Sequence, residues 1–354
     1  MRAFLLAGGF ATRLWPLTEK RAKPLLPLAG KPLIDHLIDN INNSATSLPS
    51  LPAEASAKAG GERPTCPERS RGGEGFNDRG MPITVSINAA FAPSFEHWKT
   101  ERKHARVEIV VEQSRKDTEK LGALGAVAEW ITKCHITEDV LLLTGDNYCG
   151  FSIAEFLAQY TAGTPLIAAH DLRDLGRAQG FGTIVPSPDG RHVAAFEEKP
   201  AQPKSSLVST GLSILPAAHL QAVTEYAKSK PDNVGGIFEE FLRRNIPVEF
   251  RAYKEPWFDI GSFEAYLEAT RVLVGDRVLL EEGATCSETE TEGSVILGNH
   301  SVVRNSVLRN VILFEHCTVE DCTLTDCILD DHCVLQGIDL SAQMLREGTM
   351  LRRT

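Results

Sequence analysis

The sequence predicts an α/β protein whose main domain holds a doubly wound, mostly parallel sheet, followed by a short left-handed parallel β-helix. Val107–Val111 and Val140–Thr144 are continuous apolar runs, typical of strands that are buried on both faces. Helical patterns at about 122–133 and 152–160 lie between and after these runs, an alternation typical of a doubly wound sheet. A short repeat at about 276–340 predicts the β-helix. We expect the ligand site of such a sheet beyond the carboxyl ends of its strands.

The chain opens on a predicted strand and a predicted helix. Met1–Ala7 is a short apolar run that meets Gly8-Gly9 at once. It lacks the basic region, longer apolar core and cleavage site of a signal peptide, so we expect the first strand of the sheet here. After Lys31, apolar residues recur with helical spacing, and Pro32 suits the first turn of a helix. These apolar residues are Leu33, Ile34, Leu37, Ile38 and Ile41.

Residues 43–80 have a different composition from the segments around them. Gly, Pro, Ser and charged residues dominate, and neither helical nor strand periodicity survives. We expect a disordered insertion between the first helix and a strand at Ile83–Ile87, with a functional lid as the alternative. On this interpretation the first domain spans 1–270, including the insertion, and the β-helix spans 276–340.

The predicted β-helix is built from short repeats of a small or polar residue, any residue and an aliphatic residue. Their mean spacing lies between five and six residues, close to the hexapeptide period of a parallel β-helix. We expect the aliphatic side chains to point inward, with the small residues packed beside them. The cysteines among these are then packing residues and not metal ligands. The repeats begin at Ser294, Ser301, Ser306, Asn310, Cys317, Cys322, Cys327 and Cys333.

Composition excludes several classes of function. The formal net charge of −10 argues against nonspecific binding to nucleic acid or to an anionic membrane. No stretch approaches the roughly 18 consecutive apolar residues of a membrane span. The eight cysteines contain no C-x-x-C pair, so neither a zinc ribbon nor a thioredoxin-like site is indicated. Reduced thiols in a cytoplasmic protein are the simplest interpretation.

The strongest motif is Leu6-Ala-Gly-Gly-Phe-Ala-Thr-Arg-Leu-Trp-Pro-Leu-Thr, followed by Lys23-Pro-Leu-Leu-Pro. Two glycines after a buried strand let the backbone approach a polyphosphate and point N–H groups at it. Arg13 and Lys23 would add fixed positive charge for a leaving pyrophosphate. The spacing fits neither a Walker A loop nor a G-x-G-x-x-G fingerprint. For the glycine pair alone, a plain strand-turn with two solvated basic residues is the alternative.

This string resembles the signature of the sugar-1-phosphate nucleotidylyltransferase family, L-A-G-G-x-G-T-R-L-x-P-L-T followed by P-K-P-L. The resemblance covers essentially all of the chain outside 43–80. Here Ala11 replaces the third Gly of the pattern, and Ala22 replaces the first Pro of P-K-P-L. If position 11 needs a positive φ, alanine costs free energy there. The resemblance implies an Mg²⁺-dependent enzyme that joins a nucleoside triphosphate and a sugar 1-phosphate.

Two aspartates are the candidate metal ligands. Asp146 follows Val140–Thr144, so it lies at the carboxyl end of a central strand, where a carboxylate suits a hard Mg²⁺ ion that bridges phosphates. An isolated Asp after a strand is more often a helix cap or a turn residue. Asp259, in Trp-Phe-Asp-Ile-Gly, is similar to the second metal-binding aspartate of the family. The resemblance therefore implies that Asp146 and Asp259 are the Mg²⁺ ligands, and it leaves open whether one ion or two are bound.

The resemblance also implies a sugar-phosphate site. Phe196-Glu-Glu-Lys-Pro makes Glu198 an acceptor for sugar hydroxyls and Lys199 a contact to the sugar phosphate, for which a compact charge is suitable. Gly182 resembles the glycine whose backbone lies against the sugar, and Thr210-Gly211 is expected to have a similar role. A solvated Glu-Glu-Lys turn is the alternative for this motif alone.

Leu121-Gly-Ala-Leu-Gly-Ala resembles the L-G-T-A-G-A segment of the family, which lies near the nucleobase and ribose. A helix start with glycines for close packing is the alternative. Ala123 and Leu124 depart from the pattern in a segment that helps to choose the base. The nucleotide-binding residues implied by the resemblance are Leu6, Ala7, Gly8, Gly9, Gly122 and Asp146.

The expected mechanism needs no general base. A sugar phosphate is substantially ionised at neutral pH, so its oxygen can attack the α-phosphorus of the nucleotide directly. The ten histidines show no triad spacing. The protein's task is then in-line positioning and neutralisation of charge, with Arg13 and Lys23 at the pyrophosphate, Lys199 at the sugar phosphate and Mg²⁺ bridging.

Several alternatives stay open. Mannose 1-phosphate with GTP and glucose 1-phosphate with dTTP or UTP are the leading substrate pairs. A noncatalytic regulatory or assembly subunit with the same layout is the competing hypothesis, although such chains typically lose the basic and acidic site residues. An acyltransferase site on the β-helix is less favoured, because His300, His316 and His332 are expected at turns. We expect the β-helix to support a homo-oligomer.

Overall fold

The computed structural model describes residues 1–47, 80–104, 106–113 and 121–353. Clustering of contacts divides the chain into two compact units. The sheet unit contains Met1–Gly9 and Leu37–Trp257, and the coil unit contains Phe10–His36 and Phe258–Thr354. The units differ from two consecutive domains, because the segment from Phe10 to His36 clusters with the C-terminal part of the chain.

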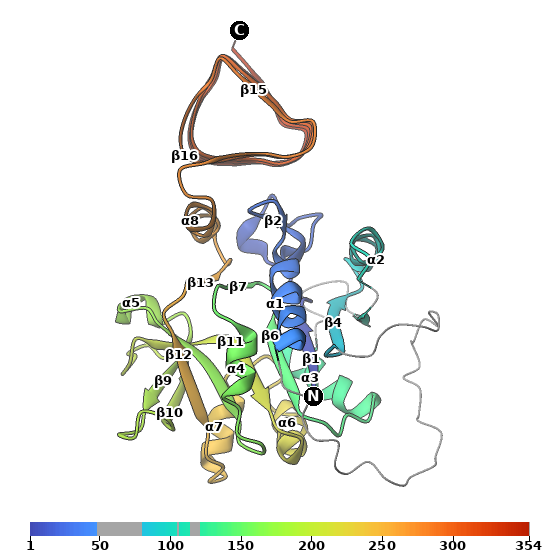
Figure 1. The fold of residues 1–354 in the computed structure, drawn as a ribbon, viewed down its shortest axis with the longest axis vertical. Coiled ribbons are helices and arrows are strands. Elements are labelled where there is room, and N and C mark those ends of the chain that lie inside the picture. The colour runs from blue at the N-terminus through green and yellow to red at the C-terminus, as the bar shows by residue number, and fades with distance from the viewer. Residues whose placement is uncertain (48–79, 105, 114–120, 354) are drawn as a thin grey trace. The chain divides into compact units, whose positions relative to one another are not determined.

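The sheet unit is built on a nine-stranded sheet of order β10-β9-β11-β6-β1-β4-β5, with β8 paired to β11 and β12 paired to β8. From β6 to β5 every pair is parallel, as predicted. Beyond β6, β11 pairs antiparallel with β6, β8 and β9. Figure 1 shows this arrangement around β1, β6 and β11. The strands are β1 (Arg2–Leu6), β4 (Ile83–Asn88), β5 (Val107–Glu112), β6 (Val140–Thr144), β8 (Leu166–Asp171), β9 (Gly182–Pro186), β10 (Val193–Glu198), β11 (Leu207–Leu215) and β12 (Glu249–Tyr253).

One of the two strands predicted to be buried on both faces is more exposed than expected. β6 is buried along nearly its whole length, which confirms the prediction. β5 is buried at its two ends and half-buried between them. The physical reason is position: β5 is the edge strand of the sheet, so one side has no neighbouring strand within the described residues.

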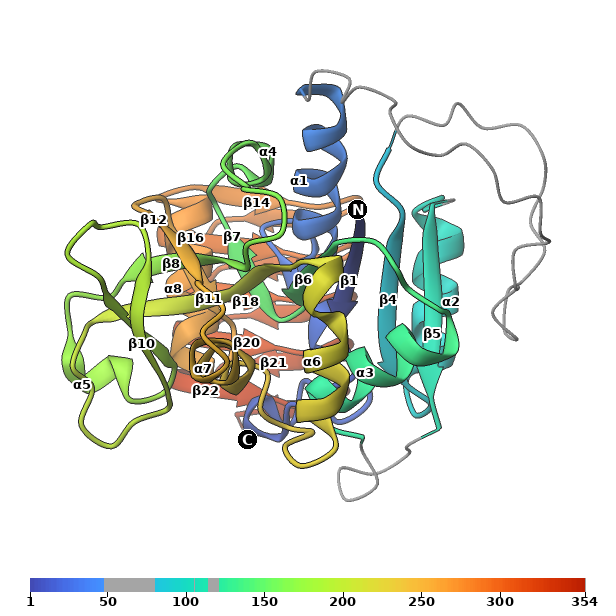
Figure 2. The same ribbon diagram turned by 90° about the horizontal axis from the view of Figure 1, so that it is seen from below.

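Helices cover the sheet, and the predicted helices at 122–133 and 152–160 are present as α3 and α4. Figure 2 shows α3 and α6 side by side, and the two helices are in contact. Their apolar faces join a core in which the Phe4 and Trp130 ring centroids are 4.4 Å apart. Helices α2 (Ala92–Glu101), α3 (Ala123–Lys133), α4 (Ile153–Ala158), α5 (Leu175–Ala178), α6 (Leu220–Ala227) and α7 (Gly236–Arg243) belong to this unit, with the short elements β7 (Asn147–Cys149) and η4 (Ala217–His219).

The first helix is longer than predicted. α1 runs from Leu33 to Ser47, so the proposed insertion at 43–80 begins too early. The helix continues because Ile41 and Ser44 are both buried, and the Ser44 hydroxyl donates to the Ile41 carbonyl at 2.5 Å. The rest of the predicted insertion, residues 48–79, lies outside the described residues.

The coil unit contains two five-stranded parallel sheets in which paired residues of successive strands lie 17 positions apart at the start, as in Thr285↔Val302, and 16 positions apart further on, as in Val307↔Thr323. In Figure 1 these strands stack as a triangular coil, which fits the predicted parallel β-helix, although each turn is shorter than three hexapeptides. The first sheet has β14 (Val278–Leu280), β16 (Glu290–Leu297), β18 (Val307–Leu313), β20 (Thr323–Leu329) and β22 (Asp339–Leu345). The second has β15 (Thr285–Ser287), β17 (Val302–Arg304), β19 (Thr318–Glu320), β21 (Val334–Gln336) and β23 (Met350–Arg352).

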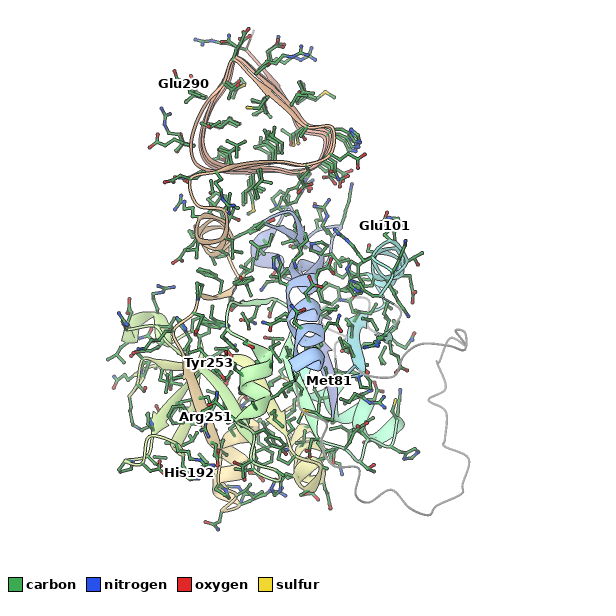
Figure 3. All side chains as sticks on the ribbon, in the orientation of Figure 1. Met81, Glu101, His192, Arg251, Tyr253 and Glu290 are labelled. Atoms are coloured by element: carbon green, nitrogen blue, oxygen red, sulfur yellow. The ribbon has the colours of Figure 1, made fainter. Side chains whose placement is uncertain are left out.

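Side chains fill the inside of this coil, whereas Glu290 lies on its outside (Figure 3). Cys317, Cys322, Cys327 and Cys333 are buried in the core of the coil beside aliphatic residues, as predicted. The remaining elements of the unit are η1 (Thr12–Leu14), η2 (Lys23–Leu25), β2 (Pro27–Leu28), β3 (Lys31–Pro32) and α8 (Phe263–Val274), while α1 and β13 (Trp257–Asp259) cross between units. Among the described residues, no helix is long and apolar enough to cross a membrane.

Candidate active site

The carboxyl ends of β1 and β6 lie side by side at one edge of the sheet. The two strands are parallel, and Leu6 pairs with Thr144 in their register. The Gly145 N–H donates to the Leu6 carbonyl at 2.8 Å. A Cβ at Gly145 would lie 2.9 Å from the same oxygen, so glycine allows this close approach. The predicted nucleotide residues Leu6 and Ala7 therefore lie beside the segment that carries Asp146.

The glycine pair after β1 borders a polar group that sequence reasoning missed. The side-chain amide of Asn88, the last residue of β4, donates to the Gly8 carbonyl at 2.9 Å. A Cβ at Gly8 would make ordinary contacts, whereas a Cβ at Gly9 would meet no described atom within 4 Å. Gly9 thus has open space on the side of its backbone where a side chain would lie. The missed signal is a polar residue at the carboxyl end of a buried strand.

Asp146 is held by its neighbour Asn147. The Asn147 amide donates to Asp146 Oδ1 at 2.9 Å and to Thr144 Oγ1 at 2.5 Å. Asn147 is buried, and its own Oδ1 has no hydrogen-bond partner among the described residues. An oxygen acceptor without a partner beside a carboxylate suits a hard cation or its bound water. No cluster of three or more His, Cys, Asp or Glu side chains in the described residues is arranged to hold a metal.

Gly211 and Thr210 lie in β11, next to the end of β6. Gly211 has φ +77°, and a Cβ there would lie 2.2 Å from Thr144 Oγ1, so this position requires glycine for conformation and for space. Thr210 is buried; its hydroxyl donates to the Ala168 carbonyl, and its carbonyl accepts from the Trp257 indole N–H at 3.1 Å. Both polar groups of Thr210 are therefore engaged within the protein.

Gly182, Glu198 and Lys199 gather where β9 and β10 pair. Gly182 is the register partner of Glu198, and a Cβ at Gly182 would lie 2.9 Å from Glu198 Oε2. Burial raises the pKa of the Glu198 carboxyl, with nearby Lys199 opposing and Glu239 adding to this shift. Lys199 is exposed and has φ +47°. Three of the five residues that the resemblance assigns to the sugar-phosphate site are thus neighbours in the sheet unit.

The remaining predicted residues lie in the coil unit. Ala11 has φ +46° and ψ +45°, so this replacement of glycine lies in the left-handed region, the condition under which alanine costs free energy at this position. Arg13 is exposed in the short helix that follows. The ammonium group of Lys23, which is buried, donates to Asp259 Oδ1 at 3.2 Å. A proposed pyrophosphate contact and a proposed metal ligand are therefore an ion pair in this structure.

The Gly122 segment packs closely against a loop more than 100 residues away in sequence. Gly122 has φ +82°, and a Cβ there would lie 2.5 Å from the Pro231 carbonyl. The Pro231 oxygen accepts from the backbone N–H groups of Leu124 and Gly125 at 2.8 and 3.0 Å. Close packing, the alternative named for this segment, therefore accounts for Gly122 in the structure, and Pro231 is a residue that sequence reasoning missed.

Comparison with known proteins identifies relatives over most of the chain. A family model described as nucleotidyl transferase matches residues 2–51 and 77–274. Glucose-1-phosphate thymidylyltransferase of Streptomyces antibioticus is 26% identical over 310 residues, covering 86% of this chain and 75% of that protein. Glucose-1-phosphate adenylyltransferase of Thermotoga maritima is 29% identical over 291 residues, covering 77% and 60%.

A third relative, provisionally named as a mannose-1-phosphate guanyltransferase of Sulfolobus acidocaldarius, is 23% identical over 317 residues, covering 86% of this chain and 75% of that protein. Among solved structures, a Bacillus anthracis protein provisionally named as a glucose-1-phosphate thymidylyltransferase superimposes with a TM-score of 0.55. That match has 19% identity and covers 77% of this chain and 94% of the other, so it supports the fold.

Proposed function

Because this chain belongs to the nucleotidyl transferase family, we propose that it transfers a nucleotidyl group from a nucleoside triphosphate to a hexose 1-phosphate, forming an NDP-sugar and pyrophosphate. The observation that supports this best is that Gly8-Gly9, Asp146 and Gly211 lie at or beside the carboxyl ends of the neighbouring strands β1 and β6. Ligands of open α/β sheets bind beyond such strand ends. The proposed noncatalytic alternative is not favoured, because the basic and acidic site residues are retained.

The chemistry follows from charge and position. The ionised sugar phosphate attacks the α-phosphorus without a general base, and the protein holds the two reactants in line. Glu198 accepts hydrogen bonds from sugar hydroxyls, and Lys199 contacts the sugar phosphate. Arg13 and Lys23 stabilise the negative charge of the departing pyrophosphate.

Mg²⁺ is the cation that these donors fit. Asp146 and Asp259 would each offer a carboxylate oxygen, and the acceptor on Asn147 beside Asp146 suits a water bound to the ion. Mg²⁺ usually takes one or two carboxylates and completes its shell with phosphates and water, which agrees with a site that has few protein ligands. When bound, the ion would neutralise phosphate charge.

Two substrate pairs are proposed for the reaction. Mannose 1-phosphate with GTP and glucose 1-phosphate with dTTP or UTP are both consistent with the names of the relatives, which also include adenylyltransferases. We further propose that the enzyme is cytoplasmic, because both substrate classes occur in the cytoplasm. We also propose that it forms a homo-oligomer through the coil unit. A monomeric mass from light scattering would contradict the oligomer.

A pyrophosphate-release assay tests the function. It crosses GTP, dTTP, UTP, ATP and CTP with mannose, glucose, galactose and N-acetylglucosamine 1-phosphates, with and without Mg²⁺. We expect one strongly preferred pair and no turnover without a divalent cation. Silence across the grid from folded protein would overturn the proposal and favour the regulatory alternative.

A further inference from the structure

The loop of residues 230–235, between α6 and α7, is held by hydrogen bonds of Asn233. The Asn233 carbonyl oxygen of the side chain accepts from the Gly236 N–H at 2.7 Å, and the Asn233 amide donates to the Tyr226 hydroxyl at 3.3 Å. The Asn233 N–H donates in turn to the Lys230 carbonyl at 3.2 Å. The Asn233 side chain thus links α6 to the start of α7, and the Asn233 backbone N–H closes the turn that carries Pro231, so the loop has a defined conformation.

The first half of the loop holds the start of α3. As described above, the Pro231 carbonyl accepts from Leu124 and Gly125, and it lies where a side chain on Gly122 would be. This carbonyl satisfies two N–H groups of the first turn of α3, which have no partner inside the helix. The orientation of the Gly122 segment is therefore set by the loop.

The second half of the loop borders the Glu198 carboxylate. A Cβ at Gly235 would lie 1.9 Å from Glu198 Oε2 and 3.0 Å from Glu198 Cδ and Phe196 Cε1. The backbone of Gly235 is helical, with φ −66° and ψ −35°, so any residue fits its conformation. The requirement for glycine here is one of space alone. One turn further along α7, Glu239 Oε1 accepts from the Glu198 N–H at 2.9 Å.

We propose that this loop positions two substrate-binding segments, with Gly235 leaving the space that the Glu198 carboxylate occupies and Pro231 holding the Gly122 segment. The inference rests on the proposed function, in which Glu198 receives the sugar and the Gly122 segment lies near the nucleotide. Gly235 acts through Glu198 and is a positioning residue. Its replacement by alanine displaces a flexible carboxylate and leaves the backbone unstrained, so the fold is retained.

The test compares Gly235→Ala with Asn233→Ala and with Glu198→Ala, using the preferred substrate pair. Gly235→Ala is expected to raise KM for the sugar phosphate about tenfold to a hundredfold, because small misplacement of a binding group has effects of this size. Its KM for the nucleotide stays within about twofold of wild type. Asn233→Ala, which removes the side-chain hydrogen bonds to Tyr226 and Gly236, is expected to raise KM for both substrates.

The double variant Gly235→Ala/Glu198→Ala decides whether Gly235 acts through Glu198. Once the carboxylate is absent, Gly235→Ala should change the sugar-phosphate KM by less than about twofold, since the two residues act as one unit. Equal increases in both backgrounds, or a parallel rise in the nucleotide KM, would overturn the positioning role. A wild-type enzyme that turns over no substrate pair would instead overturn the proposed function, and the inference with it.

Discussion

Arg21 is predicted to attach the segment that carries Arg13 and Lys23 to the stacked parallel strands of the coil unit. Within the coil unit, Arg21 donates to Asp330 Oδ1 at 3.1 Å and to the Asp331 carboxylate, and its guanidinium lies 4.9 Å from the centroid of the Phe314 ring. The Asp330 side chain is only 9% exposed. Burial raises the pKa of Asp330, and the Arg21 charge opposes that shift.

The size of the effect of Arg21→Met follows from this geometry. Removing one partner of a buried ion pair costs about 3–5 kcal/mol, because the other charge is left buried and unpaired. Here the Arg21 side chain is 28% exposed and that of Asp331 is 22% exposed, so solvent screens part of the cost. With the lost ring contact included, we expect a loss of about 2–3 kcal/mol in the free energy of unfolding.

A double-mutant cycle of Arg21→Met and Asp330→Asn, followed by denaturant unfolding, measures this coupling. We expect an interaction energy of about 1.5 kcal/mol or more, as found for residues in one ionic network. Lys20→Met is the matched control: Lys20 pairs with Glu347 at 2.9 Å, but its side chain is 77% exposed and solvent screens the pair, so its loss should lower the free energy of unfolding far less than Arg21→Met does. If the effects of Arg21→Met and Asp330→Asn on the free energy of unfolding add within about 0.5 kcal/mol, the proposed coupling between the two side chains is refuted.

The same variant has a pH signature. In Arg21→Met the Asp330 carboxyl is left without its principal cation, so its pKa in the folded state should rise further. A raised folded-state pKa contributes stability that is present below the unfolded pKa and lost as pH rises through the folded pKa. The destabilisation should therefore be larger at pH 8 than at pH 5. An equal loss at both pH values would contradict a buried, unpaired Asp330.

Three further changes test single residues. Ala11→Gly should stabilise the protein by about 0.5–1 kcal/mol, since relief of the left-handed alanine exceeds the added entropy of glycine in the unfolded chain; a lower Tm would oppose this. Because the pKa of Glu198 is raised, sugar-phosphate affinity should fall as pH drops through a range above the ordinary carboxyl value. Glu198→Gln should lose this pH dependence and keep only the one that arises from titration of the substrate phosphate. Identical pH profiles for the wild type and Glu198→Gln would contradict a role of Glu198 in sugar binding. Asp146→Asn should lower kcat by at least about a hundredfold with unchanged circular dichroism, and full activity would refute the metal assignment.

The local pattern of apolar and polar residues along the chain determines the secondary-structure elements, and the motifs determine which chemical groups are available to the site. Continuous apolar runs predicted β6 and the parallel part of the sheet, because strands buried on both faces need apolar residues at every position. The short repeat predicted the stacked coil, since each turn must place the same side-chain type inward. At Ala11 the sequence indicated only where strain would arise if the backbone had a positive φ, and the structure supplied the φ of +46°.

Tertiary structure alone decided how these parts are used. The exposure of β5 follows from its place at the sheet edge, and the close packing of Gly122 follows from Pro231, far away along the chain. The pair of Lys23 with Asp259 joins residues 236 positions apart, and Gly235 adjoins Glu198 only because α7 packs on β10. Periodicity encodes which face of an element is apolar, but it carries no information about which distant side chain will meet that face. Contacts between distant side chains depend on the packing of the whole chain. This packing determines which charged groups pair in the candidate site and where room is left beside its backbone.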